Sequence, residues 1–164
     1  MSREAWSAIQ QPTPEAAMRA RDLLTEFPTV TLDTLVVDAA RLMAERDLAG
    51  LIVVTDEGRP HSVLPGTQVL ALAVPGYCQD DPALARVVDE EHADRFLDAL
   101  GDSTVRQALP KNPRELPVTD PDATLLEIAA LMARTRSPLV AVVDDGRLLG
   151  AITLQALMDQ VTGA

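Results

Sequence analysis

The stretch Val36-Val37-Asp38-Ala39-Ala40-Arg41-Leu42-Met43 has a counterpart in Leu125-Leu126-Glu127-Ile128-Ala129-Ala130-Leu131-Met132, 89 positions later. In both stretches apolar residues recur at positions i, i+3, i+4 and i+7, which is the spacing of one helix face. Each stretch also has a leucine directly before its final methionine. The spacing therefore predicts two related helices and an internal duplication of the chain.

The segments around the two helices repeat in the same order. A short extended segment comes first (29–31 and 116–119), and a β-rich run follows each helix (51–55 and 139–143). Next come a glycine turn (56–59 and 144–147), a second strand (62–64 and 148–153) and a closing helix (66–74 and 154–162). The sequence thus predicts an α/β (α+β) fold with a β-α-β-β-α unit occurring twice. Such small units bury too little apolar surface alone, so we expect them to pack with pseudo-twofold symmetry and shared clefts.

Four segments follow from this pattern. They are an N-terminal tail (1–17), a first repeat (18–75), an acidic insert (76–103) and a second repeat (104–164). The insert holds eight acidic and two basic residues, and its Asp81-Pro82 start and Gly101 end are typical of helical structure. A further helix is expected to begin at Thr13 and to run to about Leu24.

Local sequence signals also predict how the two related helices begin. Thr124 and Glu127 form a capping box at the start of the second helix. The first helix has Leu35 where the second has Thr124, so Asp33 or Thr34 is expected to cap it instead.

The composition excludes several classes of protein. The 164 residues carry 14 Lys+Arg against 25 Asp+Glu, a net charge of −11, and only 2% are aromatic, which disfavours nucleic acid as a partner. The sequence contains no run of about 18 apolar residues, so we expect no direct membrane insertion. One cysteine, Cys78, fits a reducing compartment and excludes a disulfide framework. We therefore expect a cytoplasmic protein.

The histidines, the cysteine and the acidic run give little sign of chemistry. His61 and His92 have no carboxylate or thiol partner at metal-ligand or triad spacing, and Cys78 has no basic neighbour. Asp89-Glu90-Glu91 is interpreted as a solvated face. We therefore predict no catalytic residue, no metal site and no enzyme.

Six stretches of the two repeats match a known family. They are Val30-Thr31 through Met43, Gly50 through Asp56 with Gly58, Val118 through Met132, Ser137-Pro138-Leu139-Val140, Asp144-Asp145-Gly146, and Gly150-Ala151-Ile152-Thr153. With these features the doubled unit resembles a tandem pair of CBS domains, the cystathionine-β-synthase-type regulatory module that is also called a Bateman module. The resemblance implies a non-catalytic protein that binds an adenosyl ligand (AMP, ADP, ATP, S-adenosylmethionine or NADH) in the inter-repeat cleft and modulates a partner. No cofactor is required.

The resemblance also assigns ligand-binding residues in each repeat. In the second repeat they are Val118, Arg136, Ser137, Pro138, Thr153 and Ala156; in the first repeat, with weaker support, they are Thr29, Val30, Gly50 and Gln68. The family commonly holds the ribose with Thr/Ser-x-x-Asp at the start of the closing helix. This sequence keeps the hydroxyl in Thr153 but has Ala156 at the carboxylate position, and it has Pro65 and Gln68 at the two positions of the first repeat.

Backbone N–H groups of Thr153-Leu154-Gln155 and the nearby Arg134, Arg136 and Arg147 favour a phosphate in the second repeat. The alternative to a sensor is a ligand-free dimeric scaffold that docks on an enzyme or transporter. The missing carboxylates favour this alternative. Residues 69–74 are apolar on every side of their helix, so we expect another surface to cover them. We therefore predict a homodimer whose interface lies near this helix and near its counterpart, which carries Leu154, Leu157, Met158 and Val161.

Overall fold

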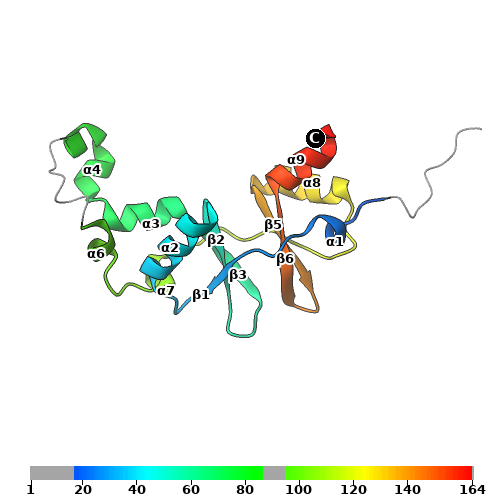
Figure 1. Ribbon diagram of the computed structural model, residues 1–164, viewed down its shortest axis with the longest axis horizontal. Coiled ribbons are helices and arrows are strands. Elements are labelled where there is room, and N and C mark those ends of the chain that lie inside the picture. The colour runs from blue at the N-terminus through cyan, green and yellow to red at the C-terminus, as the bar shows by residue number, and fades with distance from the viewer. Residues whose placement is uncertain (1–16, 87–94, 164) are drawn as a thin grey trace, which may run out of the picture. The chain divides into compact units, whose positions relative to one another are not determined.

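The computed structural model describes residues 17–86 and 95–163 (Figure 1). Its contacts group the chain into two compact units. Unit 1 comprises residues 1–25, 117–144 and 149–164, and unit 2 comprises residues 26–116 and 145–148. Each unit has its own three-stranded sheet and its own buried core, and each is described by itself.

Unit 2 contains the first β-α-β-β-α repeat. Its elements are β1 (Thr29–Thr31), α2 (Val36–Arg46), β2 (Gly50–Val54), β3 (Pro60–Pro65) and α3 (Gly66–Ala73). The sheet has the order β1-β2-β3, with β1 parallel and β3 antiparallel to β2. Val36, Ala39 and Met43 are buried on one face of α2 and belong to the core that the sheet covers. The apolar spacing of this helix therefore predicted its buried face correctly.

Unit 1 contains the second β-α-β-β-α repeat, apart from the first two residues of β6, and its elements come in the same order. They are β4 (Val118–Thr119), α8 (Leu125–Thr135), β5 (Leu139–Asp144), β6 (Arg147–Thr153) and α9 (Leu154–Thr162). The sheet has the order β4-β5-β6, with β4 parallel to β5. Ile128 and Met132 of α8 are buried in its core with Leu157 of α9. The two β-α-β-β-α repeats are thus confirmed.

The glycine turns lie where the sequence predicted them. Gly58 joins β2 to β3 with φ +79°, and Gly146 joins β5 to β6 with φ +77°. Asp145 precedes Gly146 and also has a positive φ, +50°. Two successive residues with positive φ are typical of the tight turns that connect twisted strands.

The two related helices begin differently. Thr124 caps α8 as predicted, because its Oγ1 accepts the Glu127 N–H at 3.3 Å and Glu127 Oε2 accepts the Thr124 N–H at 2.6 Å. The prediction that Asp33 or Thr34 caps α2 is wrong. Leu35 is the N-cap residue without a side-chain bond, and the Val36 N–H donates to the Ser103 carbonyl at 2.8 Å. The backbone carbonyl of Ser103, at the end of the insert, therefore replaces a capping side chain.

The insert is helical in its described parts. It forms α4 (Gly76–Asp80), a 3₁₀ turn η2 (Pro82–Arg86) and α6 (Phe96–Leu100), and α7 (Val105–Ala108) follows it. Asp81 Oδ1 accepts the Ala83 N–H at 3.1 Å, and Gly101 ends α6 with φ +52°. Residues 87–94 lie outside the described residues, and the expectations for His92 and for Asp89-Glu90-Glu91 lie there as well.

Each unit also takes in a short helix that directly precedes the other unit's repeat in the sequence. The helix α1 (Ala20–Leu23) packs in unit 1 beside α8 and β6, where the Ala20 N–H donates to the Ala123 carbonyl (Figure 1). Thr25 then pairs with Ala151 of β6. The expected helix 13–24 is shorter than predicted in its described part, since it covers only α1, and residues 13–16 lie outside the described residues.

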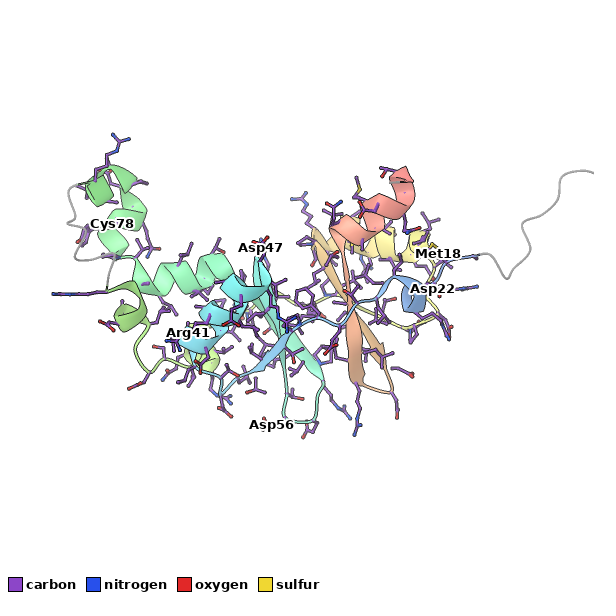
Figure 2. All side chains as sticks on the ribbon, in the orientation of Figure 1. Met18, Asp22, Arg41, Asp47, Asp56 and Cys78 are labelled. Carbon is purple, nitrogen blue, oxygen red and sulfur yellow. The ribbon has the colours of Figure 1, made fainter. Side chains whose placement is uncertain are left out.

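In unit 2 the corresponding segment is α7. Val105 and Ala108 are buried in the core of the first repeat, and Thr104 bridges to Leu35. Figure 2 labels Met18 and Asp22 at the other segment, α1, where Met18 packs against the core of unit 1. The boundaries 18–75 and 104–164 stay predictions about the duplicated sequence, because the compact units follow packing rather than chain order.

Candidate functional site

The start of α9 holds the centre of the predicted site in the second repeat. Thr153 is the N-cap residue, and its Oγ1 accepts the Ala156 N–H at 3.2 Å. The Leu154 N–H donates to the Pro138 carbonyl at 2.8 Å. These two bonds hold Pro138, Thr153 and Ala156 together at one end of the sheet. They also correct the prediction of free N–H groups in this helix turn, because the Leu154 N–H is already bonded.

The loop from α8 to β5 supplies two more predicted residues. Arg136 ends α8 in the left-handed conformation, with φ +53°, and its side chain is exposed. The half-buried Ser137 donates from Oγ to the Leu139 carbonyl at 2.7 Å and accepts the Leu139 N–H at 3.3 Å. A hydroxyl has one proton and two lone pairs. Ser137 therefore has one acceptor position left for a ligand.

Val118 lies on the strand next to this loop. It pairs in register with Ala141 of β5 and is 46% exposed. A half-exposed valine offers apolar surface that an adenine ring covers well. The structure thus places all six predicted residues of the second repeat in unit 1, on β4, the α8–β5 loop and the start of α9.

The start of α9 has no carboxylate at position 156. Ala156 is half-buried and offers no side-chain acceptor to the two hydroxyls of a ribose. Charge-assisted hydrogen bonds contribute about 1.5–3 kcal/mol each, and 1.4 kcal/mol corresponds to a tenfold change in affinity. Without that acid, Thr153 is the side chain at this helix start that can meet a ribose.

The charges near the site are fewer than the sequence predicted. Arg147 begins β6 and Thr153 ends it, so the strand separates them by about 20 Å at 3.3 Å per residue. Arg147 therefore cannot reach a ligand held at Thr153. Arg136 stays the candidate cation, since it directly precedes Ser137.

The first repeat arranges its predicted residues differently. Gln68 Nε2 donates to the Ala108 carbonyl at 3.0 Å, so this side chain joins α3 to α7. Val30 is 5% exposed and belongs to the core of unit 2. Gly50 lies against β3, where a Cβ would come within 3.0 Å of the Leu64 carbonyl oxygen. Of the four predicted residues, Thr29 alone has an exposed side chain.

Other candidate chemistry is scarce in the described residues. Cys78 is 6% exposed, and His61 Nδ1 lies 2.9 Å from Ser62 Oγ. In residues 17–86 and 95–163 no three His, Cys, Asp or Glu side chains are grouped so that they could hold a metal ion. Across the same residues, no helix combines the length and the apolar character needed to cross a bilayer.

Sequence reasoning missed a cavity of about 340 Å³ on unit 1. It is lined by Thr119, Asp120, Ala123, Glu127, Ala130, Leu131 and Arg134. None of the six ligand-binding residues predicted for the second repeat lines it, although Arg134 was expected near a phosphate. One signal was available in the duplication. Position 130 is alanine, whereas the first repeat has Arg41 at the equivalent position.

Comparisons with known proteins agree with this architecture. The profile of the family described as "CBS domain" matches residues 20–72 and 113–163. The crystal structure of a CBS domain-containing protein of unknown function from Kribbella flavida is 51% identical. The match covers 89% of this chain and 99% of that protein, with a TM-score of 0.83.

Two further structures share the fold at lower identity. CBSX2 from Arabidopsis thaliana is 22% identical, with 90% of this chain and 96% of that chain covered and a TM-score of 0.68. A structure of CBSX2 in complex with AMP is 23% identical, with 88% and 96% covered and a TM-score of 0.62. No curated protein matches the chain. The two matched segments and the doubled β-α-β-β-α fold together place this chain in the CBS domain family.

Proposed function

We propose that this chain is a non-catalytic regulatory module that binds an adenosyl ligand at the start of α9 and thereby modulates a partner. CBS-domain pairs are regulatory proteins, and the related CBSX2 has been crystallised with AMP. The observation that carries the proposal is the pair of bonds around Thr153. One bond fixes the Thr153 hydroxyl at the start of α9, and the other joins that helix start to the Pro138 carbonyl, in a unit that also supplies Val118 and Ser137.

The proposed contacts follow from the chemistry of each group. Val118 and Pro138 offer apolar surface to the adenine, and the remaining lone pair of Ser137 accepts from its exocyclic amine. Thr153 Oγ1 already accepts the Ala156 N–H, so it donates its proton to a ribose oxygen. Arg136 pairs with a phosphate. The neutral ribose contact contributes about 0.5–1.5 kcal/mol, so we expect weaker binding than a carboxylate would give.

The direct test is isothermal titration calorimetry of the whole chain with AMP, ADP, ATP, S-adenosylmethionine and NADH. At least one ligand should bind, and Thr153→Val should weaken it about tenfold by removing the ribose contact. Thr153→Ser keeps the hydroxyl and should bind like the native chain. Thr162→Val is a matched control, since its hydroxyl bonds to Met158 at the far end of the same helix. No heat with any ligand at millimolar concentration would reject the sensor.

A second candidate is a ligand-free dimeric scaffold that docks on an enzyme or transporter. Apolar side chains on α9 favour it, since Leu154, Met158 and Val161 are 44%, 47% and 66% exposed. Large apolar residues gathered on one exposed helix are typical of interaction surfaces. On α3 of the first repeat, Leu70 is 51% exposed.

Sedimentation velocity at micromolar concentration tests the homodimer. The native chain should sediment as a dimer, and Met158→Glu should shift it towards the 17.6 kDa monomer by burying a charge in the interface. Leu84→Glu changes a similarly exposed residue in η2 and serves as the control. A native chain that is monomeric throughout would contradict the dimer. A dimer together with silent ligand titrations would favour the scaffold.

A further inference from the structure

The cavity on unit 1 has a polar rim with opposite charges at its two ends. Asp120 and Glu127 lie towards the start of α8, and Arg134 lies in its last turn. Arg134 lies seven positions after Glu127, which corresponds to about 10.5 Å along the helix axis. The rim thus presents two acids and one base across a span that suits a small molecule rather than a macromolecule.

Both acids are oriented by hydrogen bonds from the backbone. Glu127 Oε2 accepts the Thr124 N–H at 2.6 Å, and Asp120 Oδ1 accepts the Asp122 N–H at 2.8 Å. Backbone N–H groups fix a carboxylate in place without neutralising it. Within the described part of the chain, no ion pair includes Asp120, Glu127 or Arg134. The rim charges therefore remain available to a ligand.

The floor of the cavity is apolar and built from small side chains. Ala123 is 4% exposed, Ala130 lies one helical turn after Glu127, and Leu131 is half-buried beside it. A volume of about 340 Å³ lies at the lower end of the range typical of small-molecule sites. The floor can accept a short apolar group.

The duplication shows why the cavity is open in this repeat. By the repeat spacing, Asp38, Arg41 and Glu45 of α2 correspond to Glu127, Ala130 and Arg134 of α8. In the first repeat Arg41 Nη1 lies 3.5 Å from Asp38 Oδ1, so the helix supplies a cation to its own acid (Arg41 is labelled in Figure 2). In the second repeat alanine replaces that arginine. The acid is kept, the internal cation is lost, and a base appears one turn further on.

We propose that this cavity binds a small zwitterion, namely an amino acid with a short apolar side chain. Its ammonium group lies between the carboxylates of Asp120 and Glu127, in the place that the Arg41 guanidinium takes in the first repeat. Its carboxylate pairs with Arg134, whose guanidinium can make two parallel hydrogen bonds to it. Its side chain covers Ala123, Ala130 and Leu131.

Isothermal titration calorimetry on the whole chain tests this assignment with three probes. Leucine carries both charges, N-acetylleucine lacks the ammonium group, and leucinamide lacks the carboxylate. Leucine should bind, and each derivative should bind at least tenfold more weakly because it loses one charged contact. An undetectable affinity for leucine at 10 mM, or equal affinities for all three probes, would overturn the assignment.

Two variants locate the binding. Arg134→Gln should weaken leucine binding at least tenfold, whereas Arg46→Gln, in the last turn of α2, should leave it unchanged. Ala130→Arg should abolish binding by filling the cavity, and the fold tolerates an arginine at this position of the first repeat. Leucine binding that survives both Arg134→Gln and Ala130→Arg would overturn the site. AMP titrations of Ala130→Arg keep this result separate from the proposed sensor, since Ala130 is not among the proposed AMP contacts.

Discussion

The closing helices α3 and α9 hold the same place in their repeats and begin with different chemistry. In α9 the N-cap is Thr153, whose hydroxyl accepts the Ala156 N–H, and in α3 the N-cap is Pro65, which forms no side-chain bond. Three residues on, α3 carries Gln68, which bonds to Ala108. The first repeat thus uses the Gln68 side chain to join α3 to α7, whereas the second repeat has a half-buried hydroxyl that caps its closing helix. The same fold therefore begins one closing helix with residues that stabilise the unit and the other with a candidate ligand site.

The segments that complete the two units differ as well. In unit 1 the N-terminal segment runs along β6, with reciprocal backbone bonds of 3.0 Å between Thr25 and Ala151. This close approach requires Gly150, because a Cβ there would lie 2.5 Å from the Thr25 carbonyl oxygen. The equivalent residue of the first repeat is Ser62, which is fully buried. The glycine of the second repeat thus gives room for a neighbour against the backbone of β6.

The largest predicted effect breaks this contact. Gly150→Ala should destabilise the protein by about 3 kcal/mol, because the added methyl group overlaps the Thr25 carbonyl and the Leu24 side chain. Urea unfolding followed by circular dichroism measures the loss, and faster hydrogen exchange at Ala151 should accompany it. Gly76→Ala is the control, since a Cβ there meets nothing within 4 Å. Equal stability of both variants would show that Gly150 is not held by the N-terminal segment.

A smaller effect sharpens the contrast between the closing helices. Gln68→Met should cost about 1–2 kcal/mol, because it leaves the carbonyl of the buried Ala108 without its donor. Gln155→Met is the matched control, since Gln155 bonds to Asp159 on the surface and should cost a few tenths of a kcal/mol. Unfolding free energies from urea titrations compare the two. If Gln68→Met is as harmless as Gln155→Met, then Gln68 is not structural and is available to a ligand.

The smallest effect concerns the two equivalent helices α2 and α8. Arg41→Ala removes an exposed i,i+3 ion pair with Asp38 and should cost less than about 0.5 kcal/mol. It also gives α2 the alanine that opens the cavity beside α8. Thermal unfolding at low and at high salt measures the change, and the small difference from the native chain should shrink at high salt. A loss above 1 kcal/mol would mean that Arg41 packs in a way that the surface pair does not explain.

Local signals in the sequence predicted most of the fold. The i, i+3, i+4, i+7 spacing identified the buried faces of α2 and α8, and Gly58 and Gly146 marked the turns, because these features depend on neighbours along the chain. Non-local contacts escaped prediction. The cap of α2 comes from the Ser103 carbonyl, and the docking of α1 depends on Gly150. A backbone donor or acceptor from a distant segment leaves no residue-type signal at the position it serves.

In the candidate site, too, local features were predicted and contacts between distant segments were not. The resemblance to CBS domains placed Thr153, Pro138 and Ser137 near one another, because they flank the strands and helix that the repeat pattern identifies. The pattern did not reveal that Gln68 bonds to Ala108, because α7 lies 40 residues away in sequence. It also did not reveal that β6 carries Arg147 away from Thr153. Comparing the two repeats position by position, rather than each with its family, would have drawn attention to Ala130.

The measurement that tests the central claim most directly is the affinity of Ala156→Asp for AMP by isothermal titration calorimetry. If the start of α9 holds a ribose through Thr153, the restored carboxylate should tighten binding by about tenfold to a hundredfold. Gln68→Asp should give no such gain, because Pro65 offers no hydroxyl beside it. An unchanged or absent affinity in Ala156→Asp, in a chain that still folds, would contradict the claim that α9 begins at a ribose site.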